Sequence, residues 1–117
     1  MNIGVEEAEG ATRVWARGRL DVADVEIAQR HFEQALERGG PVRVELADAS
    51  SMHSAWLGTL LAARATAMAR GRELAVTSYG YALTHCLETL GLQSLLGAAW
   101  LSEADEVGYF FFDDVDP

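Results

Sequence analysis

Stretches with the apolar period of a strand alternate along the chain with stretches that have the apolar period of a helix. In residues 42–46 apolar and charged side chains take turns, which is the pattern of a strand. The helical pattern is longest in residues 54–69, where a stripe facing the core is predicted for Leu57, Leu60, Leu61, Ala65 and Met68. Strands are predicted at residues 3–7, 12–20, 42–46 and 74–77, with a last short strand within residues 95–101. Helices are predicted at residues 25–36, 54–69 and 83–90, with a final helical turn or two from residue 102.

The order of these elements predicts an α/β fold. Strands and helices alternate after an initial pair of strands, which favours a largely parallel sheet with helices packed on it. The first two strands can pair antiparallel, so the sheet is expected to be mixed. A chain of 117 residues, half of them hydrophobic, is long enough for one packed core. We therefore expect a single domain over residues 1–117, with a mostly parallel sheet of four or five strands and about four helices.

The segment that leads into the helix at 54–69 has the clearest functional interest. Residues 47–53 carry Ser50 and Ser51 and have the polar composition of a loop. Ser54 stands where the helix is expected to begin. A hydroxyl at that place can cap the helix, or it can carry a phosphate that faces free backbone N–H groups. The residues by themselves leave both roles open.

The charge of the chain narrows the classes of function. A net charge of −9 repels nucleic acid backbones. All nine basic residues are arginines, so a lysine Schiff base and a phosphate-loop lysine are excluded. Residues 1–10 lack the apolar core of a signal peptide, and no apolar run approaches the roughly 18 residues of a membrane helix. We expect a cytoplasmic protein without membrane insertion, in which the single Cys86 is a small buried hydrophobe.

The chemistry-bearing residues do not predict an enzyme. His53 and Ser54 are adjacent, and sequence neighbours rarely have the hydrogen-bond geometry of a nucleophile and its base. No spacing of His, Cys or carboxylates makes a metal site. Gly39-Gly40 precedes a strand, whereas phosphate-binding loops precede a helix. We expect no catalytic residue, no metal and no cofactor.

Four short segments carry a resemblance to a known family. They are Gly18-Arg19-Leu20-Asp21, the strand at 42–46, the run from His53 to Leu61, and Leu87-Glu88-Thr89-Leu90-Gly91-Leu92 followed by Leu95-Leu96. In their order and spacing they resemble the STAS domain family, that of bacterial anti-sigma factor antagonists. The resemblance extends from about Thr12 to about Asp105 and implies a STAS-like fold.

The resemblance implies a protein-binding regulator in bacterial signal transduction and transcription control. The family's usual motif reads Asp-Ser-Ser/Thr-Gly-Leu-Gly, and a partner anti-sigma kinase phosphorylates its first serine, which matches Ser54. The implied partner is an anti-sigma factor or a related kinase-like regulator. This chain departs from the motif, with His53 for the aspartate, Ala55 for the second hydroxyl and Trp56 for the glycine. The expected partner surface comprises Asp21, Ser50, Ser51, His53, Ala55, Trp56 and Gly58, with Ser54 as the candidate phosphoacceptor.

Several alternatives stay open at this point. The chain can instead be a STAS scaffold or subunit of a signalling or lipid-transport complex that lacks the phosphoserine switch, or a small-ligand sensor with a pocket near Trp15 or Trp56. Trp56 itself fits two roles, an exposed anchor for a partner or a core residue whose N–H group is satisfied. The aromatic run at 109–112, within the acidic segment 103–117, can pack on the same chain or form a partner surface, and a homo-oligomer is possible.

Overall fold

The structure is a computed structural model, and it describes residues 1–97 and 100–101. Its strands are β1 (Asn2–Ala8), β2 (Ala11–Leu20), β3 (Val42–Leu46), β4 (Ala49–Met52) and β5 (Leu74–Tyr79). Its α-helices are α1 (Val25–Glu37), α2 (Ser54–Ala69) and α3 (Tyr81–Thr89), and its 3₁₀ helices are η1 (Val22–Asp24) and η2 (Gln93–Gly97). The helix predicted from residue 102 lies outside the described residues.

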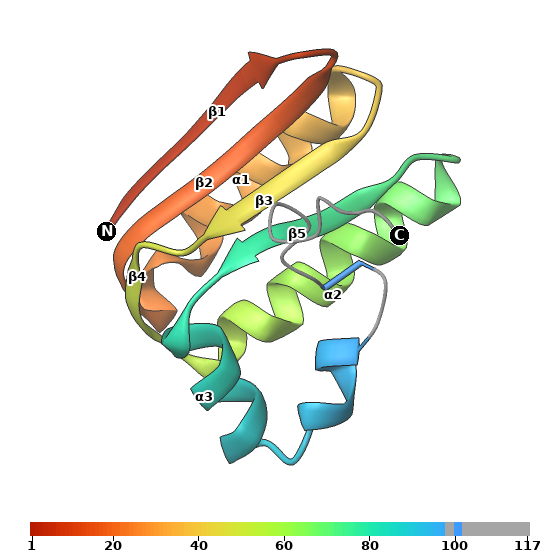
Figure 1. Cartoon of the computed structure of the whole chain (residues 1–117). Helices are drawn as coiled ribbons and strands as arrows, with labels where there is room; N and C mark the ends of the chain where they lie inside the picture. The colour runs from red at the N-terminus through yellow and green to blue at the C-terminus, as the bar shows by residue number, and fades with distance from the viewer. Residues whose placement is uncertain (98–99, 102–117) are drawn as a thin grey trace.

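The sheet is mixed, as predicted. Its strands lie in the order β1-β2-β3-β5; β1 pairs antiparallel with β2, and the other neighbours are parallel. Figure 1 shows α1 and α2 behind the sheet, on one of its faces, and α3 at the end of the sheet where β4 and α2 meet. The fold is of the mixed α/β class that the residues predicted, with three α-helices in the described part of the chain where about four helices were expected in all.

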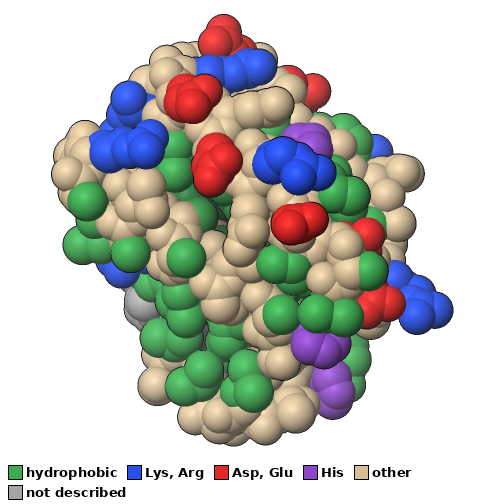
Figure 2. Space-filling view, turned by 180° about the vertical axis from the view of Figure 1, so that it is seen from behind, with side chains coloured by type: hydrophobic (Ala, Val, Ile, Leu, Met, Phe, Trp, Pro, Cys, Tyr) green, Lys and Arg blue, Asp and Glu red, His purple; other side chains and the backbone are tan. Residues whose placement is uncertain are grey.

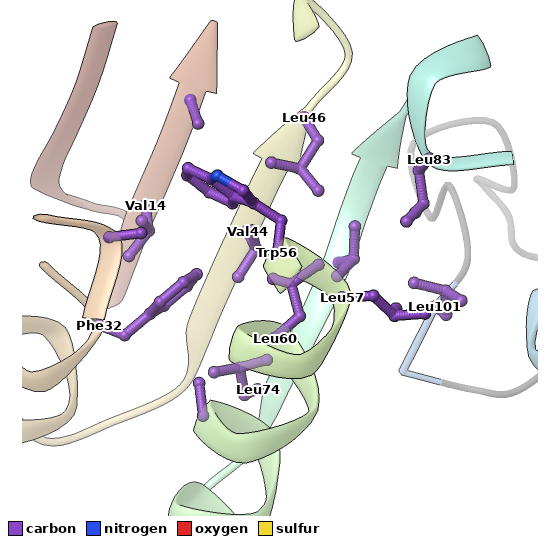
Figure 3. Close-up of a cluster of buried hydrophobic side chains, with 14 of the residues drawn as sticks. Val14, Phe32, Val44, Leu46, Trp56, Leu57, Leu60, Leu74, Leu83 and Leu101 are labelled. Carbon is purple, nitrogen blue, oxygen red and sulfur yellow. The ribbon is translucent and has the colours of Figure 1, made fainter. Parts of the chain in front are cut away.

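The core lies between the sheet and the two helices. Alternate residues of the strands point into it, among them Val14, Val44 and Val76, each at most 1% exposed. Figure 3 shows Val44 facing apolar side chains of α2, such as Leu60. The alternation in β2 and β3 follows directly from the two-residue period of a strand that has one buried face.

The opposite face of the sheet carries charged and aromatic side chains. The guanidinium carbon of Arg17 lies 4.4 Å from the centre of the Trp15 ring, so this guanidinium stacks on the ring. Arg13 binds Glu45 through two hydrogen bonds of 2.9 and 2.6 Å. Gly4 lies under the Trp15 ring, since a Cβ atom at that position would come within 2.5 Å of Trp15 Cζ2.

Two predictions about the elements were wrong. Residues 49–52 are not a loop but the strand β4, which pairs with the end of β2 at Gly18–Leu20, where β2 extends beyond β3. Of the predicted short strand within residues 95–101, the described residues show only a single parallel bridge from Leu101 to Val76, while residues 95–97 belong to η2. Short segments of this kind depend on which edges the neighbouring strands leave free, and that cannot be read from local periodicity.

The predicted core stripe of α2 was also wrong in part. Leu57 and Leu60 are buried, but Leu61 and Met68 are 38% and 58% exposed, and Ala65 is exposed as well. The buried residues of the helix are instead Trp56, Leu57, Thr59, Leu60, Ala63 and Ala67. Because α2 is apolar on almost every side, its periodicity did not determine which side faces the sheet.

Candidate functional site

The start of α2 is held by His53. His53 is the residue before the helix, and its ring Nδ1 accepts a hydrogen bond of 3.0 Å from the backbone N–H of Ala55. This acceptor role requires the neutral ring with its hydrogen on Nε2. The backbone N–H of His53 donates to the Leu20 carbonyl over 2.8 Å, which ties the helix start to the end of β2.

Ser54 is the first residue of α2, and it is exposed. The prediction that Ser54 could cap the helix was wrong, because His53 takes that place. Among residues 1–97 and 100–101, no group forms a hydrogen bond with the Ser54 hydroxyl. The hydroxyl is therefore accessible at the positive end of the helix dipole.

Asp21 lies beside the start of α2 although it comes 33 positions before Ser54 in sequence. Its side chain accepts a hydrogen bond of 2.7 Å from the backbone N–H of Val22, and Asp24 accepts one of 3.2 Å from the backbone N–H of Asp21. The bond to Asp24, together with the one that the Asp21 side chain accepts from the backbone N–H of Asp24, forms the capping box of η1. The Asp21 carbonyl accepts a hydrogen bond of 2.9 Å from the indole Nε1 of Trp56, which connects η1 to the first turn of α2.

Trp56 is a core residue. Its side chain is fully buried, and its N–H group is satisfied by the Asp21 carbonyl. Figure 3 shows its ring between α2 and the strands, near Val44 and Leu46. The prediction that Trp56 contacts a partner was therefore wrong, and of the two roles left open by the sequence the structure shows the core role. Ala55 is half-buried and offers a partner only a backbone edge and a methyl group.

β4 brings the two serines of the candidate site alongside the end of β2, which leads into Asp21. Ser50 and Ser51 are both exposed, and Ser51 pairs in register with Arg19 of β2. One turn into α2, Gly58 is exposed, and a Cβ atom there would have open space around it. We call the set Asp21, Ser50, Ser51, His53, Ser54 and Gly58 the α2 N-terminal surface. The structure thus assembles all predicted partner residues in one region, apart from the buried Trp56 and the half-buried Ala55.

Sequence reasoning missed two exposed neighbours of this surface. The guanidinium of Arg19 lies 3.7 Å from the carboxylate of Asp21, beside Ser51. Tyr81, 73% exposed, stacks on His85 at the start of α3, which packs against β4. Arg19 could have been predicted as a neighbour of the surface, because it belongs to the segment Gly18-Arg19-Leu20-Asp21. No local sequence pattern predicts that Tyr81 lies near β4.

The geometry of this surface presents hydroxyl and carboxylate groups that can bind a partner. The His53 nitrogen that could serve as a base already accepts the Ala55 N–H and forms no hydrogen bond with Ser54. In the part of the chain that the structure describes, no three His, Cys, Asp or Glu side chains converge as metal ligands would. Within that same part, no helix has the length and apolarity needed to cross a membrane.

Comparisons with known proteins support the fold and the family resemblance predicted from the sequence. The family model described as "Mlab, STAS domain" matches residues 3–97, which is most of the chain. The structure of the unphosphorylated form of the anti-sigma factor antagonist SpoIIAA is similar, with 18% identity, a TM-score of 0.64, and coverage of 80% of this chain and 84% of that one. A crystal structure of an anti-sigma factor antagonist from Mycobacterium paratuberculosis is similar at 17% identity and a TM-score of 0.67, covering 80% of each chain. A search of curated protein sequences gives no significant match.

Proposed function

The chain belongs to the STAS domain family, and from this premise we propose that it is a non-enzymatic regulatory domain that binds another protein through its α2 N-terminal surface. The partner is an anti-sigma factor or a related kinase-like regulator, the class that the two similar antagonists suggest. The surface suits such a role because it combines exposed hydroxyls, a carboxylate and an exposed glycine that permits close approach of a partner backbone.

The observation that carries this proposal is the exposed and unengaged hydroxyl of Ser54 at the first position of α2. A phosphate there would add roughly −1.5 to −2 charges. The helix dipole favours such a charge, so the modified domain would stay folded. A partner bound to this surface would have to bury the phosphate group or dissociate. Phosphorylation of Ser54 by a partner kinase would therefore act as a release switch.

A second candidate function is constitutive binding through the same surface. His53 replaces the carboxylate of the family motif, and its ring occupies the N–H group of Ala55 in the first turn. A kinase that depends on the missing carboxylate would recognise Ser54 poorly. The domain would then serve as a scaffold or subunit of a larger complex without a switch.

A small-ligand sensor has less support. The recess beside Trp15, lined also by Glu45 and Ser78, encloses about 60 Å³. Pockets for small ligands usually enclose about 300 Å³ or more. Trp56 is fully buried and lines no opening toward solvent.

Affinity capture with matched variants tests the proposed function. The full chain and its Ser51→Arg variant are used as baits in extracts of the host, and bound proteins are quantified by mass spectrometry. Ser94→Arg, an equal change at an exposed position of η2, is the control. We expect Ser51→Arg to lose a partner that Ser94→Arg retains. Equal capture by both variants would contradict the assignment of the surface.

The switch is tested separately from binding. Incubation of the full chain with the identified partner and ATP, followed by phosphopeptide mass spectrometry, shows whether Ser54 is modified. We expect a phosphate on Ser54 and loss of the partner by Ser54→Glu. A partner that binds Ser54→Glu and leaves Ser54 unmodified would establish the constitutive alternative.

A further inference from the structure

The outer side of α2 exposes an apolar surface that the described residues do not cover. Leu61 is 38% exposed and Met68 is 58% exposed, and Ala65 lies exposed between them. Figure 2 shows the helix side of the molecule, where hydrophobic side chains gather in the lower left part while most charged side chains lie above and to the right. We call Leu61, Ala65 and Met68, together with the exposed Ala62 and Ala69, the α2 outer face.

The charges around this face are mainly positive, in a chain whose net charge is −9. Arg64 is the only charged residue between Ser54 and Ala69, and its guanidinium carbon lies 5.0 Å from the centre of the Trp100 ring. A cleft of about 280 Å³ opens between α2 and β5, lined by Arg64, Met68, Arg72, Glu73 and Trp100 among others. The face therefore fits an occupant that is apolar and acidic.

The chain itself contains such a segment. Residues 102–117 include six acidic residues and no basic one, and they enclose the aromatic run Tyr109-Phe110-Phe111-Phe112. This segment follows Leu101, which pairs with Val76 of β5, and Trp100 beside it contacts Arg64. We propose that residues 102–117 dock on the α2 outer face of their own chain, with the aromatic run over Leu61, Ala65 and Met68 and the carboxylates toward the arginines.

The length of the segment permits this docking. Eight residues from Leu101 to Tyr109 span up to about 26 Å when extended. A helix of the length of α2 spans about 24 Å, so the aromatic run can reach any part of the face. The open face of the sheet is a poorer fit, because Arg13 there is engaged by Glu45 and Glu6 and the Trp15 ring is covered by Arg17.

This inference does not rest on the proposed function, although the two surfaces adjoin. Gly58 of the α2 N-terminal surface lies three residues, about one helical turn, before Leu61. A docked segment would border the partner surface and could be displaced by a partner that extends along α2. An apolar face covered from within the chain would also be protected from association with other copies.

Photo-crosslinking in the full chain tests the docking. A benzophenone amino acid is placed at Phe111, and the crosslinked peptides are mapped by mass spectrometry in a mixture of ¹⁴N- and ¹⁵N-labelled protein. We expect links within one chain to the segment Leu61–Met68. Links between ¹⁴N and ¹⁵N chains would mean that a second copy is the occupant, and links to the open sheet face, or none to the protein, would also overturn the proposal.

Charge variants provide the matched control. Arg64→Glu is expected to lower the yield of the within-chain link by roughly threefold to tenfold, because the reversal removes an attraction and adds a repulsion of the size of a surface ion pair. Arg30→Glu, an equal change at an exposed position of α1, should leave the yield unchanged. Far-UV circular dichroism confirms that each variant is folded. Equal yields in both variants would refute the role of Arg64.

Discussion

Truncation of Trp56 is the sharpest test of the site geometry, because the structure makes this residue part of the core. Its side chain is 0% exposed, and its indole N–H donates to the Asp21 carbonyl over 2.9 Å. We expect Trp56→Phe to lower the free energy of unfolding by about 2 kcal/mol. Trp56→Ala should lower it by roughly 3–5 kcal/mol, the usual cost of emptying a large aromatic site.

The magnitude for Trp56→Phe has two parts. The Asp21 carbonyl also accepts a hydrogen bond of 3.1 Å from the backbone N–H of Asp24, so losing the indole does not leave it without a donor. The hydrogen bond therefore contributes about 1 kcal/mol rather than the larger penalty of an unsatisfied buried group. The smaller ring buries about 50 Å² less apolar surface, which adds about 1 kcal/mol.

Urea unfolding followed by far-UV circular dichroism measures both values. Trp15→Phe is the control, since Trp15 lies half-buried on the open sheet face under Arg17 and should lose less than about 1 kcal/mol. If Trp56→Phe cost less than about 0.5 kcal/mol, or no more than Trp15→Phe, the reasoning that assigns Trp56 to the core would be refuted. Because Trp56 is buried, Trp56→Phe should change the affinity for a partner only if it lowers the stability of the domain or shifts the start of α2.

Three further predictions concern the surroundings of the site and the core. His53→Ala should cost about 1 kcal/mol in urea unfolding because the cap on Ala55 N–H is lost, whereas His53→Asp should retain or raise stability; equal losses would contradict the capping role. Gly4→Ala should cost roughly 1–3 kcal/mol because its Cβ would lie 2.5 Å from Trp15, while Gly58→Ala, in open space within a helix, should gain about 0.5–1 kcal/mol by the same measurement. Burial raises the pKa of the Cys86 thiol, so the stability that the neutral thiol contributes is complete below the unfolded pKa near 8.5 and declines above it. A thiol reagent at neutral pH should accordingly modify Cys86 only in urea, and rapid modification of the native protein would contradict its burial.

The candidate site shows which of its parts the local sequence could predict. The polar residues after the strand at 42–46 pointed to the right region, because side chains that follow a parallel strand gather at one edge of a sheet. Asp21 was linked to this region by the family resemblance, and the structure shows the link as the hydrogen bond from Trp56. The identity of the helix cap, His53 rather than Ser54, depends on one residue of register that sequence patterns do not resolve.

The sequence by itself determined the order of most strands and helices, since the two-residue period of 12–20 and 42–46 and the helical period of 54–69 are local properties. It also determined the helix end at Gly91, where the backbone adopts a φ of 73° that favours glycine. The tertiary structure alone decided which side of α2 faces the sheet. That helix is apolar on almost every side, so only packing against α1, β5 and η1 could bury Trp56 and leave Leu61 and Met68 exposed.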